Sequence, residues 1–176
     1  MHIKDAFASA KLLQAANPAT LATLASYAGL RTAPRGEHLF CDKEEVRTLY
    51  ILVEGMAALY KCNGAGEKKV VFVYGPENAL NEVTVNWLPT SINCEILQDA
   101  QLLCFPIDRI LQAMEQDFGL AKAYMDSMSL KIRRLYRQMK NTSNSIRGDK
   151  RIAAKPGSSR RITGNRAPGA PASRWN

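Results

Sequence analysis

The sequence predicts a mainly β fold: a double-stranded β-roll of the jelly-roll kind, flanked by short N-terminal helices and followed by a long C-terminal helix. Two observations lead to this prediction. Short β-rich runs punctuated by turn residues fill residues 30–107, and the stretch that follows has helical texture with no proline before Pro156. With 176 residues, 46% of them hydrophobic, the chain is long enough for one domain with a sizeable core and an appendage.

The N-terminal residues predict two short helices. Residues 3–16 have apolar side chains at helical spacing. A second helix is expected over residues 17–28, with Asn17 as its capping residue and Pro18 in its first turn, where the missing amide hydrogen has no helical partner to lose.

The central part predicts short strands of four to nine residues, which favours a roll or barrel over an alternating βαβ sheet. Turn signals such as "PRG", "DKEE" and "NGAG" separate them. Gly36, Gly55, Gly66 and Gly75 are each expected at a strand end, where a positive φ or a close backbone approach is usually needed. The expected strands are residues 30–33, 37–41, 48–55, 56–62, 67–75, 91–98 and 100–107.

The helical stretch carries an apolar heptad seam over residues 117–146. Its members are spaced alternately by three and four residues: Phe118, Ala121, Met125, Met128, Ile132, Leu135, Met139, Thr142 and Ile146. A period of 3.5 held over about four heptads is typical of a coiled coil, so we expect a parallel homodimer through this helix. The methionines suit a seam whose register shifts. The alternative is a long helix that packs only on its own domain.

The basic charge is concentrated at the C-terminus. Of the formal net charge of +8, residues 1–146 contribute +1 (16 Lys and Arg against 15 Asp and Glu) and residues 147–176 contribute +7 (8 against 1). The latter segment is rich in Gly, Pro, Ser and Arg and has little apolar periodicity. We therefore expect residues 147–176 to be a disordered basic tail that attracts nucleic acid only weakly and without sequence specificity.

In order and spacing, residues 5–154 resemble the sensor half of the cyclic-AMP-receptor/Fnr (Crp/Fnr) family of bacterial transcription regulators. The resemblance rests on "TLYILVEGMAALYK", the Gly-rich hairpin, "KKVVFVYGPENALNEVTV" and the long helix ending in "SIRGDKRIAA". It implies an effector-sensing β-roll at residues 1–116, a dimerisation helix at 117–146, and normally a C-terminal winged helix-turn-helix. The implied function is ligand-gated control of transcription.

In nucleotide-binding members of that family a Gly-Glu pair is followed about ten residues later by Arg-Ser or Arg-Ala, and the arginine binds the cyclic phosphate. Here Asn81-Glu82 stands for Gly-Glu, and "PTSIN" at residues 89–93 contains no arginine. A phosphate buried without a cationic partner loses several kcal/mol per ion in desolvation. Cyclic AMP is therefore not the expected effector.

The expected effector is instead a small neutral or weakly acidic organic molecule, held between the roll and the long helix. The alternative is a filled core. The candidate effector-binding residues are Asn81, Glu82, Thr84, Val85, Ser91, Ile92, Asn93, Tyr124 and Met128, with Val83, Trp87, Cys94 and Met125 as further lining.

Other chemistries have little support in the sequence, and we expect no cofactor, no metal site and no enzymatic activity. The four cysteines stand singly, without the C-x2-C spacing of metal or iron–sulfur sites. His2 and His38 are the only histidines and are far apart, which disfavours a metal-dependent enzyme on a small barrel. Cys94 and Cys104, both on late strands, are either a redox pair or inert buried thiols.

After "KRIAA" the chain departs from the family pattern, because Pro156-Gly157 opens a segment with no hydrophobic period. Codons can be chosen for this segment so that a neighbouring frame has the texture of the start of such a DNA-binding domain. The hypothesis is a frameshifted product that keeps sensor and dimer helix and binds no specific DNA. With no signal peptide and no run of about 20 apolar residues, we expect a cytoplasmic protein that spans no membrane. The alternative is a stand-alone small-molecule-binding protein or a dominant-negative partner of a full-length relative.

Overall fold

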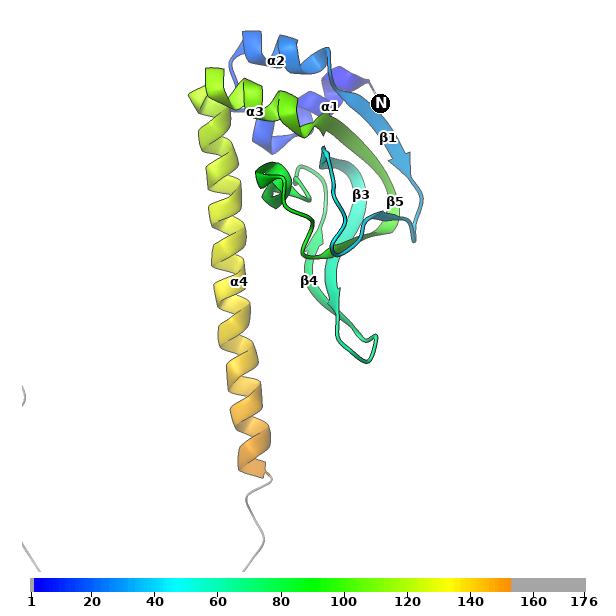
Figure 1. Ribbon diagram of the computed structural model, residues 1–176, viewed down its shortest axis with the longest axis vertical. Helices are drawn as coiled ribbons and strands as arrows, with labels where there is room; N and C mark the ends of the chain where they lie inside the picture. Colours follow the sequence, from blue (N-terminus) through cyan, green and yellow to red (C-terminus); the bar gives the residue numbers. More distant parts are fainter. Residues whose placement is uncertain (1, 153–176) are drawn as a thin grey trace, which may run out of the picture. The chain divides into compact units, whose positions relative to one another are not determined.

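The computed structural model describes the backbone of residues 2–152 and the side chains of residues 2–139 (Figure 1). The chain divides into two compact units, Met1–Arg137 and Gln138–Asn176. The roll, the helices that cover it and the cavities described below belong to the first unit.

The core of the first unit is one antiparallel sheet of five strands, which confirms the mainly β prediction. Its order is β1-β5-β3-β4, and β2 also pairs with β5. The strands are β1 (Gly29–Ala33), β2 (His38–Phe40), β3 (Thr48–Cys62), β4 (Lys68–Tyr74) and β5 (Asn93–Pro106). β3 and β5 pair along most of their length and form the centre of the sheet. The other strands pair with one or the other of them.

The two predicted breaks near Gly55 and near residue 99 were wrong, because β3 and β5 are each one continuous strand. β3 runs 15 residues through Gly55, which has φ +90° and sits among shifts in the β3–β5 register. A Cβ at Gly55 would lie 2.4 Å from the carbonyl oxygen of Asp99. Glycine here lets the strand bulge and bend against its neighbour while the ladder continues on both sides. Gly36 and Gly66 also have positive φ, whereas Gly75 does not.

The N-terminal prediction holds, with one additional short helix. The elements are α1 (Ile3–Ser9), the 3-10 helix η1 (Lys11–Leu13) and α2 (Pro18–Ala25). Asn17 is the N-cap of α2, and its side-chain oxygen accepts a hydrogen bond from the Thr20 amide at 2.9 Å. The helices α1, α2 and α3 group at one end of the roll (Figure 1).

Two helices follow the sheet, α3 (Ile107–Gln116) and α4 (Phe118–Ile152), and Asp117 separates them. Its carboxylate accepts the amide hydrogens of Asn17 at 2.8 Å and Leu120 at 3.2 Å. The bond from Asn17 is the main cause that holds the pKa of Asp117 below its ordinary value. At Gly119 a Cβ would lie 2.4 Å from the Ala15 carbonyl oxygen, so only glycine allows this approach.

The helix α4 continues beyond Ile146, where the sequence suggested its end, and residues 147–152 are helical and not part of a disordered tail. No proline interrupts the helical hydrogen bonds before Pro156, and the single Gly148 weakens a helix without ending it. The remainder of the expected tail, residues 153–176, lies outside the described residues.

Side chains that alternate along the two long strands belong to two separate hydrophobic clusters. Leu103 and Phe105 of β5 belong to a cluster with the helices, whereas Leu102 belongs to a cluster inside the roll. Neighbouring strand residues point to opposite faces, so one strand can serve both clusters. The second cluster, which contains Phe40 and Tyr74, surrounds the candidate site.

Candidate functional site

A cavity of about 230 Å³, termed the apolar cavity, lies between the roll and α4. The 3-10 helix η2 (Glu82–Asn86), which follows β4 and precedes β5 in the chain, contributes to its lining. Its lining is mostly hydrophobic, with a few polar groups: Phe40, Leu59, Val71, Phe72, Leu80, Asn81, Glu82, Val83, Thr84, Thr90, Ser91, Ile92, Met128, Lys131, Ile132 and Leu135. A ligand-sized space therefore exists at the place where the sequence suggested either a pocket or a filled core.

Most of the candidate binding residues come together at this cavity. Those that line it are Asn81, Glu82, Val83, Thr84, Ser91, Ile92 and Met128. They come from η2, from the loop before β5 and from α4, which are segments distant in the sequence. Ile132 and Leu135, which the sequence suggested only as members of the seam, also line it.

Three candidate binding residues lie elsewhere. Val85 packs against the cluster beneath the helices, because residues 82–86 form a 3-10 helix and do not alternate as in a strand. Asn93 accepts the Asp42 amide hydrogen at 3.0 Å and donates to the Tyr60 carbonyl at 3.2 Å, so its amide ties strands together.

The third, Tyr124, is 3% exposed in the cluster beneath the helices and donates from its hydroxyl to the Glu82 carbonyl at 2.7 Å. Burial, and secondly the Glu82 carboxylate, raise the pKa of Tyr124. The neutral Tyr124 hydroxyl thus links α4 to η2 by a buried hydrogen bond.

Of the further lining residues suggested by the sequence, Val83 lines the apolar cavity and the other three lie elsewhere. Trp87 is half exposed, has φ +62° and lies under the Arg47 guanidinium, which is 5.6 Å from the ring centre. Cys94 is fully buried inside the roll, and Met125 is half exposed on α4. None of these three side chains lines the apolar cavity.

The side chain of Asn81 is committed to the fold. It accepts the Tyr50 amide hydrogen at 2.9 Å and donates to the Thr48 carbonyl at 2.8 Å and the Thr84 hydroxyl at 3.2 Å. These bonds use its acceptor oxygen and both amide hydrogens. Asn81 therefore anchors the start of η2 to β3, and its polar atoms are not free to orient a ligand.

The carboxylate of Glu82 is the buried charge of the site. It is 1% exposed, accepts the Ser127 hydroxyl at 2.7 Å and forms an ion pair with Lys131 of α4. The Lys131 ammonium also donates to the Ala79 carbonyl at 2.7 Å and lies 4.8 Å from the Tyr74 ring centre. Glu82 thus binds the η2 loop to the long helix.

Lys131 is the functional residue that the sequence reasoning missed. Its side chain is 14% exposed, and burial lowers its pKa while Glu82 opposes that fall. The signal for it was present, because Lys131 follows Met128 by three residues and precedes Leu135 by four, which places it on the same helix face. A cation on an apolar helix face needs a partner, and the remote Glu82 supplies it.

The ion pair sets the electrostatics of the apolar cavity. "PTSIN" contains no cation, and the cation near the cavity is Lys131 of α4. Its ammonium is already bound to the Glu82 carboxylate and the Ala79 carbonyl. The opposite charges of Glu82 and Lys131 balance one another, and the other residues that line the cavity are uncharged. The cavity can therefore take a neutral or nearly neutral molecule by burial of apolar surface, whereas an anion would meet the Glu82 carboxylate.

The cysteine geometry favours inert thiols at Cys94 and Cys104. Both lie on β5, where Cys94 is opposite Leu59 and Cys104 opposite Tyr50 of β3, so they are separated along the strand by far more than a disulfide spans. Burial raises the pKa of Cys94 to about 12 and that of Cys104 to about 11. Such thiols hold very little reactive thiolate.

Among the described residues, no three His, Cys, Asp or Glu side chains gather as a metal ion would require. Within the same part of the chain, no helix is both long and apolar enough to cross a bilayer.

Comparison with known proteins finds a family and a fold. The cyclic nucleotide-binding domain matches residues 30–117, half of the chain. No curated protein matches the sequence.

Among solved structures, the catabolite activator protein of Thermus thermophilus is similar at 18% identity and a TM-score of 0.65. The match covers 76% of this chain and 63% of that one, so this chain spans less than two thirds of its length.

Two structures of isolated domains match along most of their own length. The sensor domain of the transcriptional regulator DNR from Pseudomonas aeruginosa is 20% identical, with a TM-score of 0.64, and the match covers 78% of this chain and 91% of that one. The N-terminal domain of a transcriptional regulator from Streptomyces coelicolor is 20% identical, with a TM-score of 0.57 and coverage of 80% and 94%. At these identities the likeness is one of fold.

Proposed function

Because this chain belongs to the family of cyclic nucleotide-binding domains, we propose that it is the sensor and dimerisation part of a ligand-responsive bacterial transcription regulator. The observation that carries this proposal is that residues lining the apolar cavity coincide with residues of the predicted dimer seam on α4. Met128, Ile132 and Leu135 line the apolar cavity and are also consecutive members of the heptad seam. A molecule in the cavity therefore touches the residues through which a second copy of the chain would bind.

The effector that suits this cavity is a small neutral or weakly acidic organic molecule. Burial of about 200 Å² of its apolar surface would contribute roughly 5 kcal/mol before the entropy of association is subtracted. A cyclic nucleotide would bring a phosphate beside the buried Glu82, and the nearby Lys131 already has two oxygen partners. We therefore propose that cyclic AMP is not the effector.

The dimer is proposed to form through the seam on residues 117–146. Large apolar side chains of this seam are left uncovered: Phe118 is 74% exposed, Met125 51%, Ile132 45%, Leu135 37% and Met139 65%. Ala121 and Met128 are half buried. A row of uncovered apolar side chains at heptad spacing is what a coiled-coil partner covers. The side chains of Thr142 and Ile146 lie outside the described residues.

The cavity is tested with a neutral apolar fluorophore, N-phenyl-1-naphthylamine, and with cyclic AMP. We expect the fluorophore to bind saturably, because the cavity is apolar, and calorimetry to show no cyclic AMP binding. Leu59→Phe places extra volume among lining residues and should abolish most of the fluorophore signal. Leu88→Phe is the matched control, since Leu88 is 63% exposed and outside the lining.

Circular dichroism melts of both variants establish that each is folded, so that a loss of signal reports on the cavity alone. Micromolar binding of cyclic AMP would overturn the proposed effector class. Equal loss of fluorophore binding in the two variants would show that the dye binds elsewhere and would refute the assignment of the site.

A further inference from the structure

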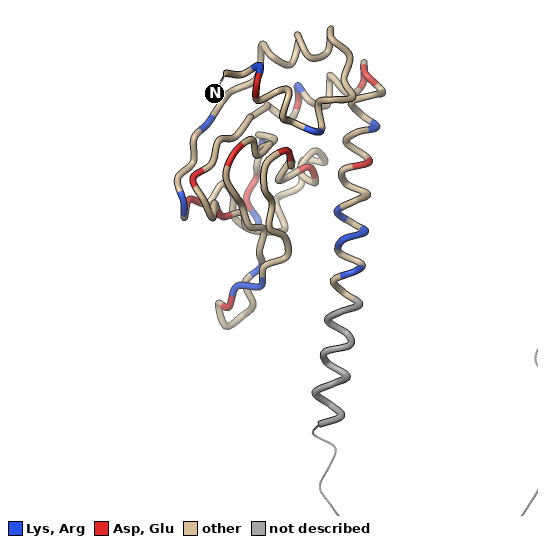
Figure 2. The backbone as a smooth tube through the Cα atoms, turned by 180° about the vertical axis from the view of Figure 1, so that it is seen from behind, with Lys and Arg blue, Asp and Glu red and all other residues tan. Residues whose placement is uncertain are grey.

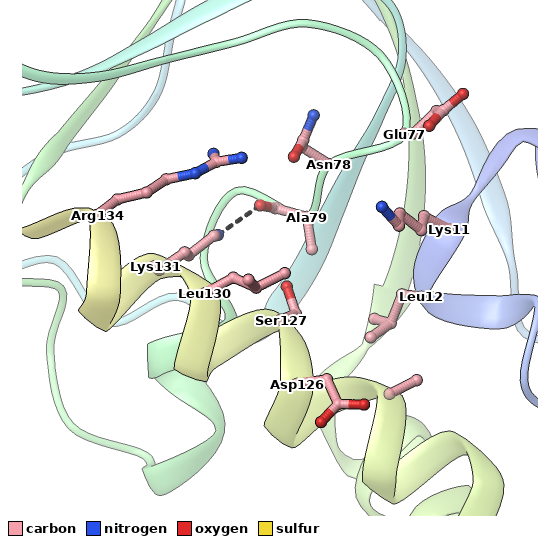
Figure 3. Close-up of a pocket in the computed structure, with 11 residues that line it drawn as sticks. Lys11, Leu12, Glu77, Asn78, Ala79, Asp126, Ser127, Leu130, Lys131 and Arg134 are labelled. Atoms are coloured by element: carbon pink, nitrogen blue, oxygen red, sulfur yellow. Dashed lines mark hydrogen bonds between the residues drawn. The ribbon is translucent and has the colours of Figure 1, made fainter.

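A second cavity of about 220 Å³, termed the polar cavity, is also lined by Lys131 (Figure 3). Three segments enclose it: η1, the turn after β4, and α4. Its lining is Lys11, Leu12, Glu77, Asn78, Ala79, Ala123, Asp126, Ser127, Leu130, Lys131 and Arg134. Lys131 and no other side chain lines both this cavity and the apolar cavity.

Two of its cations have no carboxylate partner. Among the described residues, no ion pair joins Lys11 or Arg134 to an acidic side chain. In contrast, Asp126 is paired with Lys122 at 2.7 Å, and in Figure 3 its carboxylate points away from the other lining residues. The remaining acidic residue, Glu77, also points outward in Figure 3. The polar cavity is therefore left with an excess of positive charge.

The two cations without a carboxylate partner come from distant parts of the chain, and both line the polar cavity. Lys11 lies on η1 near the N-terminus and Arg134 on α4, within the run of Lys and Arg that Figure 2 marks on this helix. Figure 3 shows their charged ends directed toward one another from opposite sides of the cavity. A guanidinium binds the two oxygens of a carboxylate or phosphate in a fork, and an ammonium adds a third contact.

We propose that the polar cavity binds a small oxyanion, a carboxylate or a phosphate group, between Arg134 and Lys11. Leu12, Leu130 and Ala123 provide apolar walls for a short alkyl portion. Asn78 is not one of the donors, because its amide nitrogen is bonded to the carbonyls of Gly75 and Pro76. This site does not depend on the proposed function of the apolar cavity.

The position of the oxyanion has a consequence for the rest of the molecule. It would join η1 to α4 across the polar cavity, beside the Lys131 ammonium that Glu82 and the Ala79 carbonyl hold. Since Lys131 also borders the apolar cavity, occupancy of one cavity should alter binding in the other.

The test titrates the protein with inorganic phosphate, with butyrate and with chloride at constant ionic strength, followed by calorimetry and by the thermal melting temperature. We expect saturable binding of phosphate, of butyrate or of both, and not of chloride. Phosphate alone would identify a phosphate group as the natural ligand chemistry, and butyrate alone a carboxylate. Each of these outcomes supports the oxyanion site.

The variants Arg134→Gln and Lys11→Gln should each weaken binding about tenfold, the effect of removing one charge-assisted hydrogen bond. The controls are Arg133→Gln, the neighbouring cation on α4, and Lys4→Gln on α1; both are exposed and outside the lining. Binding should change less than twofold in the controls. No saturable binding at millimolar concentrations would overturn the proposal, as would equal weakening in the controls, which would indicate diffuse attraction only.

Discussion

Replacing Lys131 by methionine tests whether the ion pair with Glu82 holds α4 against the η2 loop. Methionine keeps most of the side-chain length and removes the charge, so it leaves Glu82, 1% exposed, with only the Ser127 hydroxyl on its carboxylate. Breaking a buried pair by removing one partner lowers the free energy of unfolding by about 3–5 kcal/mol. That is a large part of the roughly 5–15 kcal/mol that stabilises a domain.

The matched control is Lys122→Met, which breaks a pair on the same helix. Lys122 and Asp126 are 2.7 Å apart, but their side chains are 60% and 62% exposed. An exposed pair at this spacing contributes about 0.5 kcal/mol or less. The contrast between the two variants isolates the effect of burial, because both substitutions remove a lysine from α4.

The double variant Glu82→Gln with Lys131→Met completes the cycle. It replaces both charges by neutral groups, so we expect it to be more stable than either single variant and within about 1 kcal/mol of the native protein. The assay is urea unfolding at pH 7 and fixed protein concentration, because dimerisation would make stability concentration-dependent. A loss below about 1 kcal/mol for Lys131→Met, or simple additivity in the double variant, would refute a coupled buried pair.

Two further predictions concern the seam and the thiols. Ile132→Glu should shift the protein toward monomer in sedimentation velocity, because it puts a charge into an apolar interface. Ser129→Glu is the control and should leave the dimer intact, since Ser129 is exposed and off the seam. A native protein that sediments as a monomer would contradict the proposed dimer. At pH 8, iodoacetamide should modify the exposed Cys41 and Cys62 and spare Cys94, whose burial raises its pKa to about 12, and equal labelling of Cys94 would contradict that burial. The raised pKa means that the folded state retains the Cys94 proton longer than the unfolded state, so its contribution to stability is present below pH 9.0 and declines from there toward about 12.

The role of Asn81 shows how a motif can keep its place and change its task. At this position the resemblance implied a glycine that lets the backbone approach a phosphate. Instead Asn81 binds Tyr50, Thr48 and Thr84 with all its side-chain donors and its acceptor. Glu82, next to it, is bound to α4 through Lys131 and Ser127. The segment "NEVTVN" therefore connects the sheet to α4 through these side-chain contacts, and the apolar cavity lies beside it.

The sequence by itself determined the features that depend on neighbouring residues. The capping of α2 by Asn17, the positive φ of Gly36 and Gly66, and the change from strand to helix near Pro106 all follow from local backbone preferences. The 3.5-residue period of the seam is local too, since it is a property of one helix.

Only the tertiary structure decided what depends on contacts across the fold. Gly55 continues β3 and does not end it, because Asp99 on the neighbouring strand approaches it. Residues 82–86 form a 3-10 helix, which removes Val85 from the cavity. Lys131 is buried because a carboxylate 49 residues earlier in the chain meets it there. A buried charge is stable only where its partner is placed, and that placement is a property of the whole fold.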